Sequence, residues 1–279
     1  MMLLVTGSKG QLGQTLKELY PDALFTDVEE LDITDEKEVA DFVKSNQVTE
    51  IINCAAYTAV DKAEDDEERA YKVNVLGPLN LAKTGAKLVQ ISTDYVFGGV
   101  KSTPCKEGDE KCPLSVYGKT KAECEDLLLK EAKTVLILRT SWLYSPYGNN
   151  FVKTMRRLGK ERETLTVIFD QVGSPTFALD LARAIYKILP QIKEGEKKIF
   201  NYSNEGVCSW YDFATEIMRL SGISCHVLPI ESFEYKTKAT RPCFSVLNKR
   251  AIKEAYQVEI PYWRESLEKC ITLLEEKGE

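Results

Sequence analysis

The fold is decided near the start of the chain by the stretch LLVTGSKGQLG, residues 3–13. The apolar run 3–5 predicts a buried strand, and the pattern that follows the turn predicts a helix. Between them, Gly7, Gly10 and Gly13 allow a tight turn, a close approach of backbone to a pyrophosphate at the helix N-terminus, and close helix packing. A glycine-rich turn in this position is typical of dinucleotide-binding proteins, and a purely structural turn is the alternative.

Short apolar runs alternate with helical patterns along most of the chain. The amphipathic segments 35–46 and 67–86 are long enough to be crossover helices of βαβ units. Strands that are covered on both faces form near-continuous apolar runs, as these do. The alternation predicts an α/β fold with a doubly wound, Rossmann-type parallel sheet. The expected strands contain residues 3–5, 23–25, 51–52, 88–91, 135–138, 167–169 and 199–200.

The alternation loosens after Trp142, which indicates a second, smaller lobe that shares the chain with the first domain. We expect an NAD(P)-binding Rossmann domain formed by residues 1–142 and 165–224. We expect a C-terminal substrate-binding lobe formed by residues 143–164 and 225–279.

Composition describes an ordinary compact protein. The 279 residues are 43% hydrophobic and 29% charged, which argues against a disordered or fibrous chain. With 37 basic and 43 acidic side chains, the net charge of −6 argues against nucleic acid as a partner. No apolar stretch reaches the roughly 18 residues that cross a membrane, and the N-terminus turns polar too soon for a secretory signal. We therefore expect a cytoplasmic protein that does not bind membranes.

The cysteines predict neither a zinc site nor a disulfide framework. All eight lack CxxC spacing, and His226 is the only histidine. Cys105 and Cys112 flank a polar loop and could pair in a thermophile or under oxidation, but we do not expect a disulfide in a reducing compartment.

Acidic residues after the second expected strand indicate how the adenosine half of a dinucleotide would bind. Asp27 stands 20 residues after Gly7 and can accept hydrogen bonds from the ribose hydroxyls. Its charge would repel a 2′-phosphate, which favours NADH over NADPH while leaving both open. Asp32 and Thr34 either line the adenine pocket or cap the next helix.

The third and fourth expected strands end in residues suited to a ligand edge. The segment 53–58 contains small side chains that would let backbone approach a dinucleotide, although tight packing is the alternative. Ser92 and Thr93 place hydroxyl groups at the edge where ligands of such sheets bind, or cap a turn there.

Tyr117 and Lys121 are four residues apart and therefore share one face of an expected helix. About one such pair is expected by chance, so its position directly after the fourth strand gives it meaning. A phenol with a pKa of about 10 is a poor proton donor, and a neighbouring ammonium lowers that pKa. Lys121 would tune Tyr117 in this way and hold the nicotinamide ribose.

Several longer stretches resemble the dTDP-4-dehydrorhamnose reductase family of extended short-chain dehydrogenases/reductases. The resemblance runs nearly from end to end, and its long matches are more specific than either short motif. They are NCAAYTAVDKAE (53–64), STDYVF (92–97), PLSVYGKTKAE (113–123), RTSWLY (139–144), GNNFVKTM (148–155), DQVGSPT (170–176) and Arg241-Pro242.

The resemblance implies hydride transfer from NADH or NADPH to the C4 ketone of dTDP-6-deoxy-L-lyxo-4-hexulose, which gives dTDP-L-rhamnose. It places Thr93 as hydrogen-bond donor to the ketone oxygen, Tyr117 as general acid and Lys121 beside them. Asp94 and Trp142 fall on substrate positions. Cofactor positions are Gly10, Gln11, Leu12, Asp27, Asp32, Ile33, Ala55, Ala56 and Tyr57, besides Gly7 and Gly13 of the turn.

Arg241 is a plausible partner for the substrate diphosphate, because guanidinium matches phosphate oxygens well. A surface ion pair is the alternative for Arg241, as core packing is for Trp142. Some family members carry a magnesium-binding glutamate where this chain has Thr15. We therefore expect no metal and no metal-bridged dimer, and either a monomer or a homodimer.

Two other functions remain open. Sugar-nucleotide 4,6-dehydratases and epimerase-like enzymes share the fold, but the dehydratase pattern has a glutamate where this chain has Tyr95, and elimination then lacks its base. A non-catalytic regulator similar to that of methionine adenosyltransferase is the second alternative, which the presence of Thr93, Tyr117 and Lys121 disfavours.

Overall fold

The structure, a computed structural model, describes residues 2–278. Its centre is a six-stranded, all-parallel sheet with the order β10-β5-β4-β3-β1-β2. The chain passes from β1 to β2 on one side and then to β3 on the other, so a topological switch point lies between β1 and β3. The predicted doubly wound sheet is confirmed. Its strands are β1 (Met2–Thr6), β2 (Leu24–Thr26), β3 (Val48–Asn53), β4 (Lys87–Thr93), β5 (Val135–Thr140) and β10 (Lys197–Asn201).

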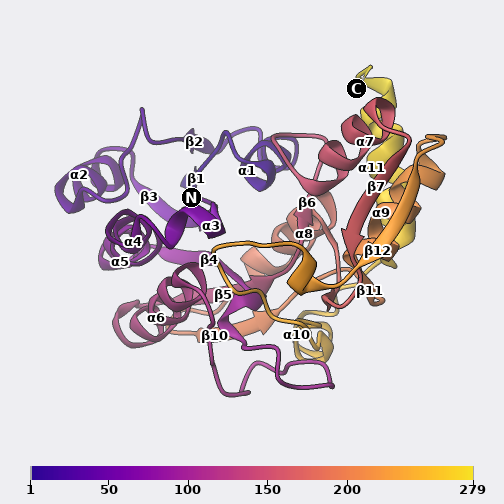
Figure 1. The fold of residues 1–279 in the computed structure, drawn as a ribbon. Coiled ribbons are helices and arrows are strands. Elements are labelled where there is room, and N and C mark those ends of the chain that lie inside the picture. The colour runs from indigo at the N-terminus through magenta and orange to yellow at the C-terminus, as the bar shows by residue number, and fades with distance from the viewer. Residues whose placement is uncertain (1, 279) are drawn as a thin grey trace.

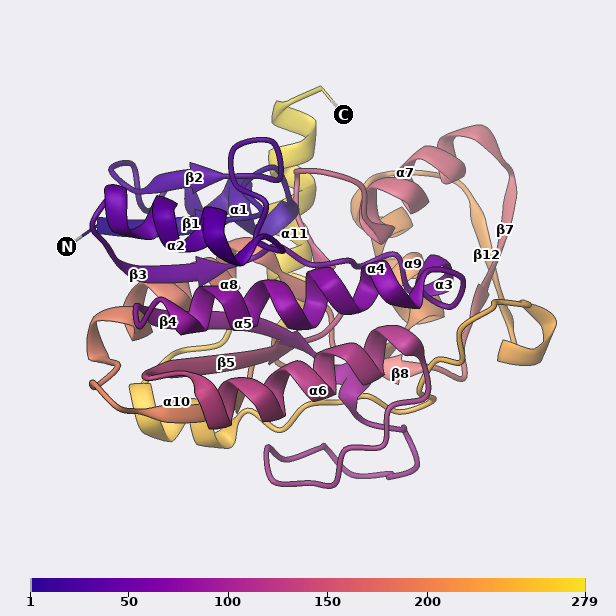
Figure 2. The ribbon, with the colours of Figure 1, turned by 90° about the vertical axis from the view of Figure 1, so that its left-hand side faces the viewer.

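Helices cover both faces of this sheet (Figure 2). Each face has its own apolar core. The near-continuous apolar runs of the central strands predict that these strands are buried on both faces. The structure confirms this, because the strands contribute side chains to both cores. The π-helical turn η1 (Lys72–Leu76) joins α4 (Glu67–Tyr71) and α5 (Gly77–Lys83) into one stretch. One face carries α1 (Gln11–Leu16), α8 (Ala178–Ile188) and α10 (Arg250–Tyr256). The other carries α2 (Glu36–Ser45), α4 (Glu67–Tyr71), α5 (Gly77–Lys83) and α6 (Val116–Glu131).

A second lobe has a separate apolar core and lies beside the sheet in Figure 1. Its aromatic centre includes Tyr144, Phe177, Phe213 and Trp263, all nearly fully buried. The lobe contains α7 (Phe151–Glu161), β7 (Thr164–Ile168), α9 (Trp210–Leu220), β12 (His226–Ile230) and α11 (Trp263–Glu276).

The packing differs from the division expected from sequence, which assigned residues 165–224 to the first domain. Strand β7 pairs with β12 and not with the central sheet, and α9 packs in the core of the second lobe. Along β7 only Leu165 and Val167 are buried, so this strand has one solvent-facing side. Conversely, α10 comes from the segment 225–279, which was expected in the second lobe, and packs on the sheet.

Side-chain caps fix where the helices near the sheet edge begin. Ser115 accepts a hydrogen bond from the backbone of Gly118 at 3.1 Å and so starts α6. Asn150 caps α7 through Lys153 in the same way. The remaining short elements are α3 (Val60–Ala63), η2 (Asp94–Val96), β6 (Leu143–Tyr144), β8 (Val172–Gly173), β9 (Thr176–Phe177), η3 (Leu189–Gln191), β11 (Cys208–Ser209) and η4 (Ser232–Glu234).

Three further expectations concern the chain as a whole. Among residues 2–278, no helix is both long and apolar enough to cross a membrane. Within the same range, no group of three or more potential ligand side chains could hold a metal ion, and Thr15 is buried with its hydroxyl donating to the Gln11 carbonyl. The eight cysteines are free thiols, with Cys105 buried and Cys112 exposed.

Candidate active site

A groove crosses the carboxyl ends of the sheet strands, where ligands of open α/β sheets bind. It consists of two cavities of about 540 and 300 Å³ that share Gly10, Cys54, Ala55 and Ala56 in their walls. Every site residue predicted from sequence lines one of them, with the single exception of Arg241. The larger cavity is lined by Gln11, Leu12, Gly13, Thr93, Asp94, Tyr117, Lys121 and Trp142. The smaller cavity is lined by Gly7, Asp27, Asp32, Ile33 and Tyr57.

The glycine turn brings three chain segments close together. Gly7 has φ of +67°, and a side chain there would place its Cβ 2.5 Å from the backbone nitrogen of Ala55. A Cβ on Gly13 would lie 2.3 Å from the Gly7 carbonyl oxygen. Gly7 therefore lets β1 approach the segment after β3, and Gly13 lets α1 pack on the turn. Gly10 lines both cavities of the groove, and its lack of a side chain would let a pyrophosphate approach the backbone closely.

The smaller cavity has an acidic rim that suits a ribose. The Asp27 carboxylate accepts hydrogen bonds from the backbone nitrogens of Lys9 at 3.0 Å and Val28 at 2.9 Å, which fixes its position. Asp32 accepts from the backbone and hydroxyl of Thr34, while Asp35 is the residue that caps α2. Asp32 and Thr34 thus line the cavity and do not cap the helix.

Arg69 also lines the smaller cavity, which the sequence did not indicate. Its guanidinium lies 6.0 Å from the ring centre of Tyr57. It belongs to α4, which begins within the acidic run 64–68, and nothing in the local sequence separates Arg69 from an ordinary solvated cation.

Tyr117, Lys121 and Thr93 meet in the larger cavity. Burial raises the pKa of Tyr117 to about 12, against a smaller lowering by its hydrogen bond with Thr93. Lys121 is 2% exposed, and its Nζ donates to the Ile91 carbonyl at 2.6 Å. Burial lowers the pKa of Lys121. The expected acidification of the phenol by Lys121 is therefore not what the structure shows, because burial dominates the pKa of Tyr117 and the Lys121 ammonium donates to a main-chain carbonyl.

Asp94 adds a buried carboxyl to the same wall. Its Oδ1 accepts from the Thr93 hydroxyl at 3.1 Å, and its Oδ2 is buried without a hydrogen-bond partner among the described residues. Burial raises the pKa of Asp94 to about 6, against smaller lowerings by the neighbouring hydroxyls of Ser245 and Thr93. Tyr95, which replaces the dehydratase glutamate, packs edge-on against Tyr117 with ring centres 5.6 Å apart.

Trp142 supplies a flat apolar wall from the end of β5. Its backbone has φ of +47°, a strained conformation for an aromatic residue. The indole stacks on Trp210 with ring centres 3.6 Å apart and an angle of 11° between the planes. The sequence did not identify Trp210 as part of this wall, because it reaches Trp142 only through the packing of α9.

Arg241 lies outside both cavities. It forms a two-pronged ion pair with Asp61, at 2.6 and 3.2 Å, and also contacts the Tyr95 hydroxyl. The surface ion pair that was the alternative interpretation is therefore present, although Tyr95 itself lines the larger cavity.

Comparison with known proteins identifies the family. The model described as "RmlD substrate binding domain" matches residues 1–276. The chain belongs to this RmlD family. Among curated relatives, the dTDP-4-dehydrorhamnose reductase of Aggregatibacter actinomycetemcomitans is 42% identical over 95% of this chain and 96% of its own length. The spore coat polysaccharide biosynthesis protein SpsK of Bacillus subtilis is 39% identical over 95% of both chains.

Solved structures agree with this assignment to the RmlD family. A dTDP-4-dehydrorhamnose reductase from Clostridium acetobutylicum superposes with a TM-score of 0.94 and 44% identity, covering 99% of this chain and all of its own. The enzyme of the same name from Bacillus anthracis, solved in complex with NADP, superposes with a TM-score of 0.92 and 38% identity. The match covers 98% of this chain and 99% of the Bacillus anthracis chain. The family resemblance seen in the sequence is confirmed.

Proposed function

We propose that this protein reduces the C4 ketone of dTDP-6-deoxy-L-lyxo-4-hexulose to the hydroxyl of dTDP-L-rhamnose, with NADH or NADPH as reductant. The observation that carries the proposal is the meeting of Thr93, Tyr117 and Lys121 in the larger of two adjoining cavities, which together form a groove suited to a dinucleotide. Relatives across the full chain length that carry the reductase name support it.

The residues of the groove fit a dinucleotide. Gly10, Ala55 and Ala56 present backbone where the pyrophosphate would pass, and the fixed Asp27 carboxylate suits the adenosine ribose. Lys121, in the larger cavity, would hold the nicotinamide ribose at the other end. When bound, the reduced nicotinamide supplies the hydride and leaves oxidised.

Tyr117 gives the proton that completes the reduction. With a pKa of about 12 it carries its proton at neutral pH, as a general acid must. As negative charge develops on the C4 oxygen, the Thr93 hydroxyl turns from Asp94 to donate to it, and the Tyr117 proton moves to the same oxygen. The carbonyl thereby becomes a hydroxyl.

Asp94, Trp142 and Arg241 would orient the sugar nucleotide. The unpartnered Oδ2 of Asp94 can accept a hydroxyl hydrogen bond from the hexose, and the indole of Trp142 offers an apolar surface. Arg241 would reach the diphosphate by exchanging its Asp61 partner for phosphate oxygens of the same geometry.

The test combines three incubations of the purified protein. The ketosugar with NADH or NADPH should consume the reduced cofactor and yield dTDP-L-rhamnose, and the ratio of kcat/KM for the two cofactors measures the effect of Asp27. Conversion of dTDP-glucose without added cofactor would instead indicate a dehydratase. Absence of turnover, together with stoichiometric capture of a methionine adenosyltransferase, would indicate the regulator.

We also propose that the protein acts in the cytoplasm, without a metal, as a monomer or homodimer. Free thiols suit the reducing compartment that also contains reduced nicotinamide cofactors. Light scattering of the purified protein measures its mass in solution, and retention of activity in EDTA tests the absence of a metal.

A further inference from the structure

A buried ion pair joins three elements directly behind the candidate active site. Glu125 on α6 accepts two hydrogen bonds from Arg139 on β5, at 2.8 and 2.7 Å, and both side chains are 1% exposed. The Ser92 hydroxyl on β4 donates to the same carboxylate at 2.7 Å. Ser92 and Arg139 are paired neighbours in the sheet, so one carboxylate ties the helix to two adjacent strands.

The ion pair continues the face of α6 that carries the proposed reacting groups. Tyr117, Lys121 and Glu125 are spaced four residues apart and lie on successive turns of one face. Each meets the end of β4: Tyr117 contacts Thr93, Lys121 donates to the Ile91 carbonyl, and Glu125 accepts from Ser92.

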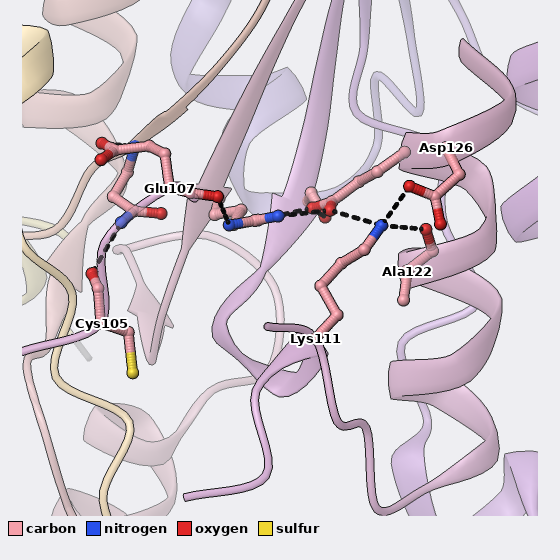
Figure 3. Close-up of polar contacts among 9 residues, drawn as sticks. Cys105, Glu107, Lys111, Ala122 and Asp126 are labelled. Atoms are coloured by element: carbon pink, nitrogen blue, oxygen red, sulfur yellow. Dashed lines mark hydrogen bonds and ion pairs between the residues drawn. The ribbon is translucent and has the colours of Figure 1, made fainter. Parts of the chain in front are cut away.

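The same pair holds the long connection between β4 and α6. Arg139 donates to the Glu107 carbonyl at 3.1 Å, and Lys111 lies 3.6 Å from the Glu125 carboxylate. Lys111 also donates to the Ala122 carbonyl and pairs with Asp126 on α6 at 2.6 Å (Figure 3). The connection between β4 and α6 is therefore bound to Arg139 through Glu107 and to Glu125 through Lys111.

Stability alone is a weak reason to bury these charges. Taking two ions out of water costs free energy that their attraction often only balances, and apolar pairs of similar volume are frequently as stable. What an apolar pair cannot supply is direction, because the guanidinium and carboxylate bond in one fixed geometry.

We propose that Glu125 and Arg139 are positioning residues that set how α6 lies against β4, and thereby the distance from Tyr117 to Thr93. The proposal rests on the proposed function, in which these two hydroxyl groups act on one oxygen. A displacement of α6 lowers the rate of the chemical step far more than it weakens binding.

The test compares variants in kcat, in KM for the ketosugar, in the dissociation constant for NADPH, and in thermal stability. In E125Q we expect kcat to fall about 10-fold or more, with KM and cofactor affinity within about threefold of wild type. R139K keeps the positive charge but loses the two-pronged geometry, so its kcat should lie between those of wild type and E125Q. D126N is the matched control, since it removes the exposed partner of Lys111 and should leave kcat unchanged.

The double variant E125L/R139M separates positioning from stability. We expect its unfolding temperature to be closer to that of wild type than the unfolding temperature of E125Q is, while its kcat stays low. A crystal structure of the double variant should show Tyr117 displaced from Thr93. Recovery of kcat together with stability, or an unmoved Tyr117, would overturn the proposal. If the wild type fails to reduce the ketosugar, the proposed function fails, and the crystal structure alone then decides the positioning claim.

Discussion

The Nζ of Lys121 lies 2.6 Å from the main-chain carbonyl oxygen of Ile91, and this bond holds a buried ammonium one helical turn from Tyr117. Burial affects the two groups in opposite directions. It lowers the pKa of Lys121 below its ordinary 10.5 and raises the pKa of Tyr117 to about 12. The lysine therefore loses its proton first when the solution becomes alkaline, while the phenol still carries the proton that reduction requires.

This order predicts the alkaline side of the pH profile. We expect kcat to fall as pH rises through the pKa of Lys121, below 10.5, because the ribose and carbonyl then lose their charged donor. K121M should have a low kcat and lack this fall. An unchanged alkaline fall in K121M would assign the titration to another group.

Asp94 predicts a pH dependence of stability. Its pKa is about 6 in the folded protein and 3.8 is its ordinary value, so between these pH values the folded state binds more protons than the unfolded state. The free energy of unfolding should fall as pH rises through this window, by about 3 kcal/mol in total.

Urea unfolding of wild type and D94N measures this contribution. The stability of D94N relative to wild type should increase by about that amount between pH 4 and pH 7. A difference that stays constant over the same range would contradict the assignment to Asp94.

Gly173 predicts a remote effect on substrate binding. A Cβ at this position would lie 2.7 Å from the indole of Trp142 and would displace the ring from its stack on Trp210. In G173A we expect KM for the ketosugar to rise several-fold and tryptophan fluorescence to change. G108A is the control, because nothing lies within 4 Å of a Cβ there. Equal KM values in the two variants would exclude a binding role for the ring.

Arg241 predicts an effect on KM with little effect on kcat. Removing a guanidinium that binds the diphosphate should cost about 1.4 kcal/mol of binding free energy, which is about 10-fold in KM. R241A is compared with R250A, whose exposed guanidinium pairs with Glu254 on its own helix. A normal KM in R241A would leave the Asp61 ion pair as the role of Arg241.

Much of this site could be predicted from sequence because parallel strands end at one edge. The apolar runs located the central strands, so the residues after them had to come together, and Thr93, Tyr117 and Lys121 do lie in one cavity. Their chemical roles stay predictions. The expectation that residues 167–169 belong to the central sheet was wrong, because an apolar run does not specify which sheet a strand joins. Strand β7 pairs with β12 instead.

Other features depend on tertiary packing that no local pattern carries. Glu125 and Arg139 are unremarkable charges in the sequence, and only the packing of α6 on the sheet buries them together. Trp210 reaches Trp142 from a different lobe. The pKa of Tyr117 was expected to fall because Lys121 is its neighbour, whereas burial decides its direction.

The role of Tyr117 as proton donor is tested by the single-turnover rate of hydride transfer in wild type and Y117F, with NADPH and the ketosugar both saturating. We expect wild type to oxidise the cofactor and form dTDP-L-rhamnose, while Y117F binds NADPH normally and reacts at least about 100-fold more slowly. If Y117F reacts as fast as wild type, Tyr117 is not the proton donor.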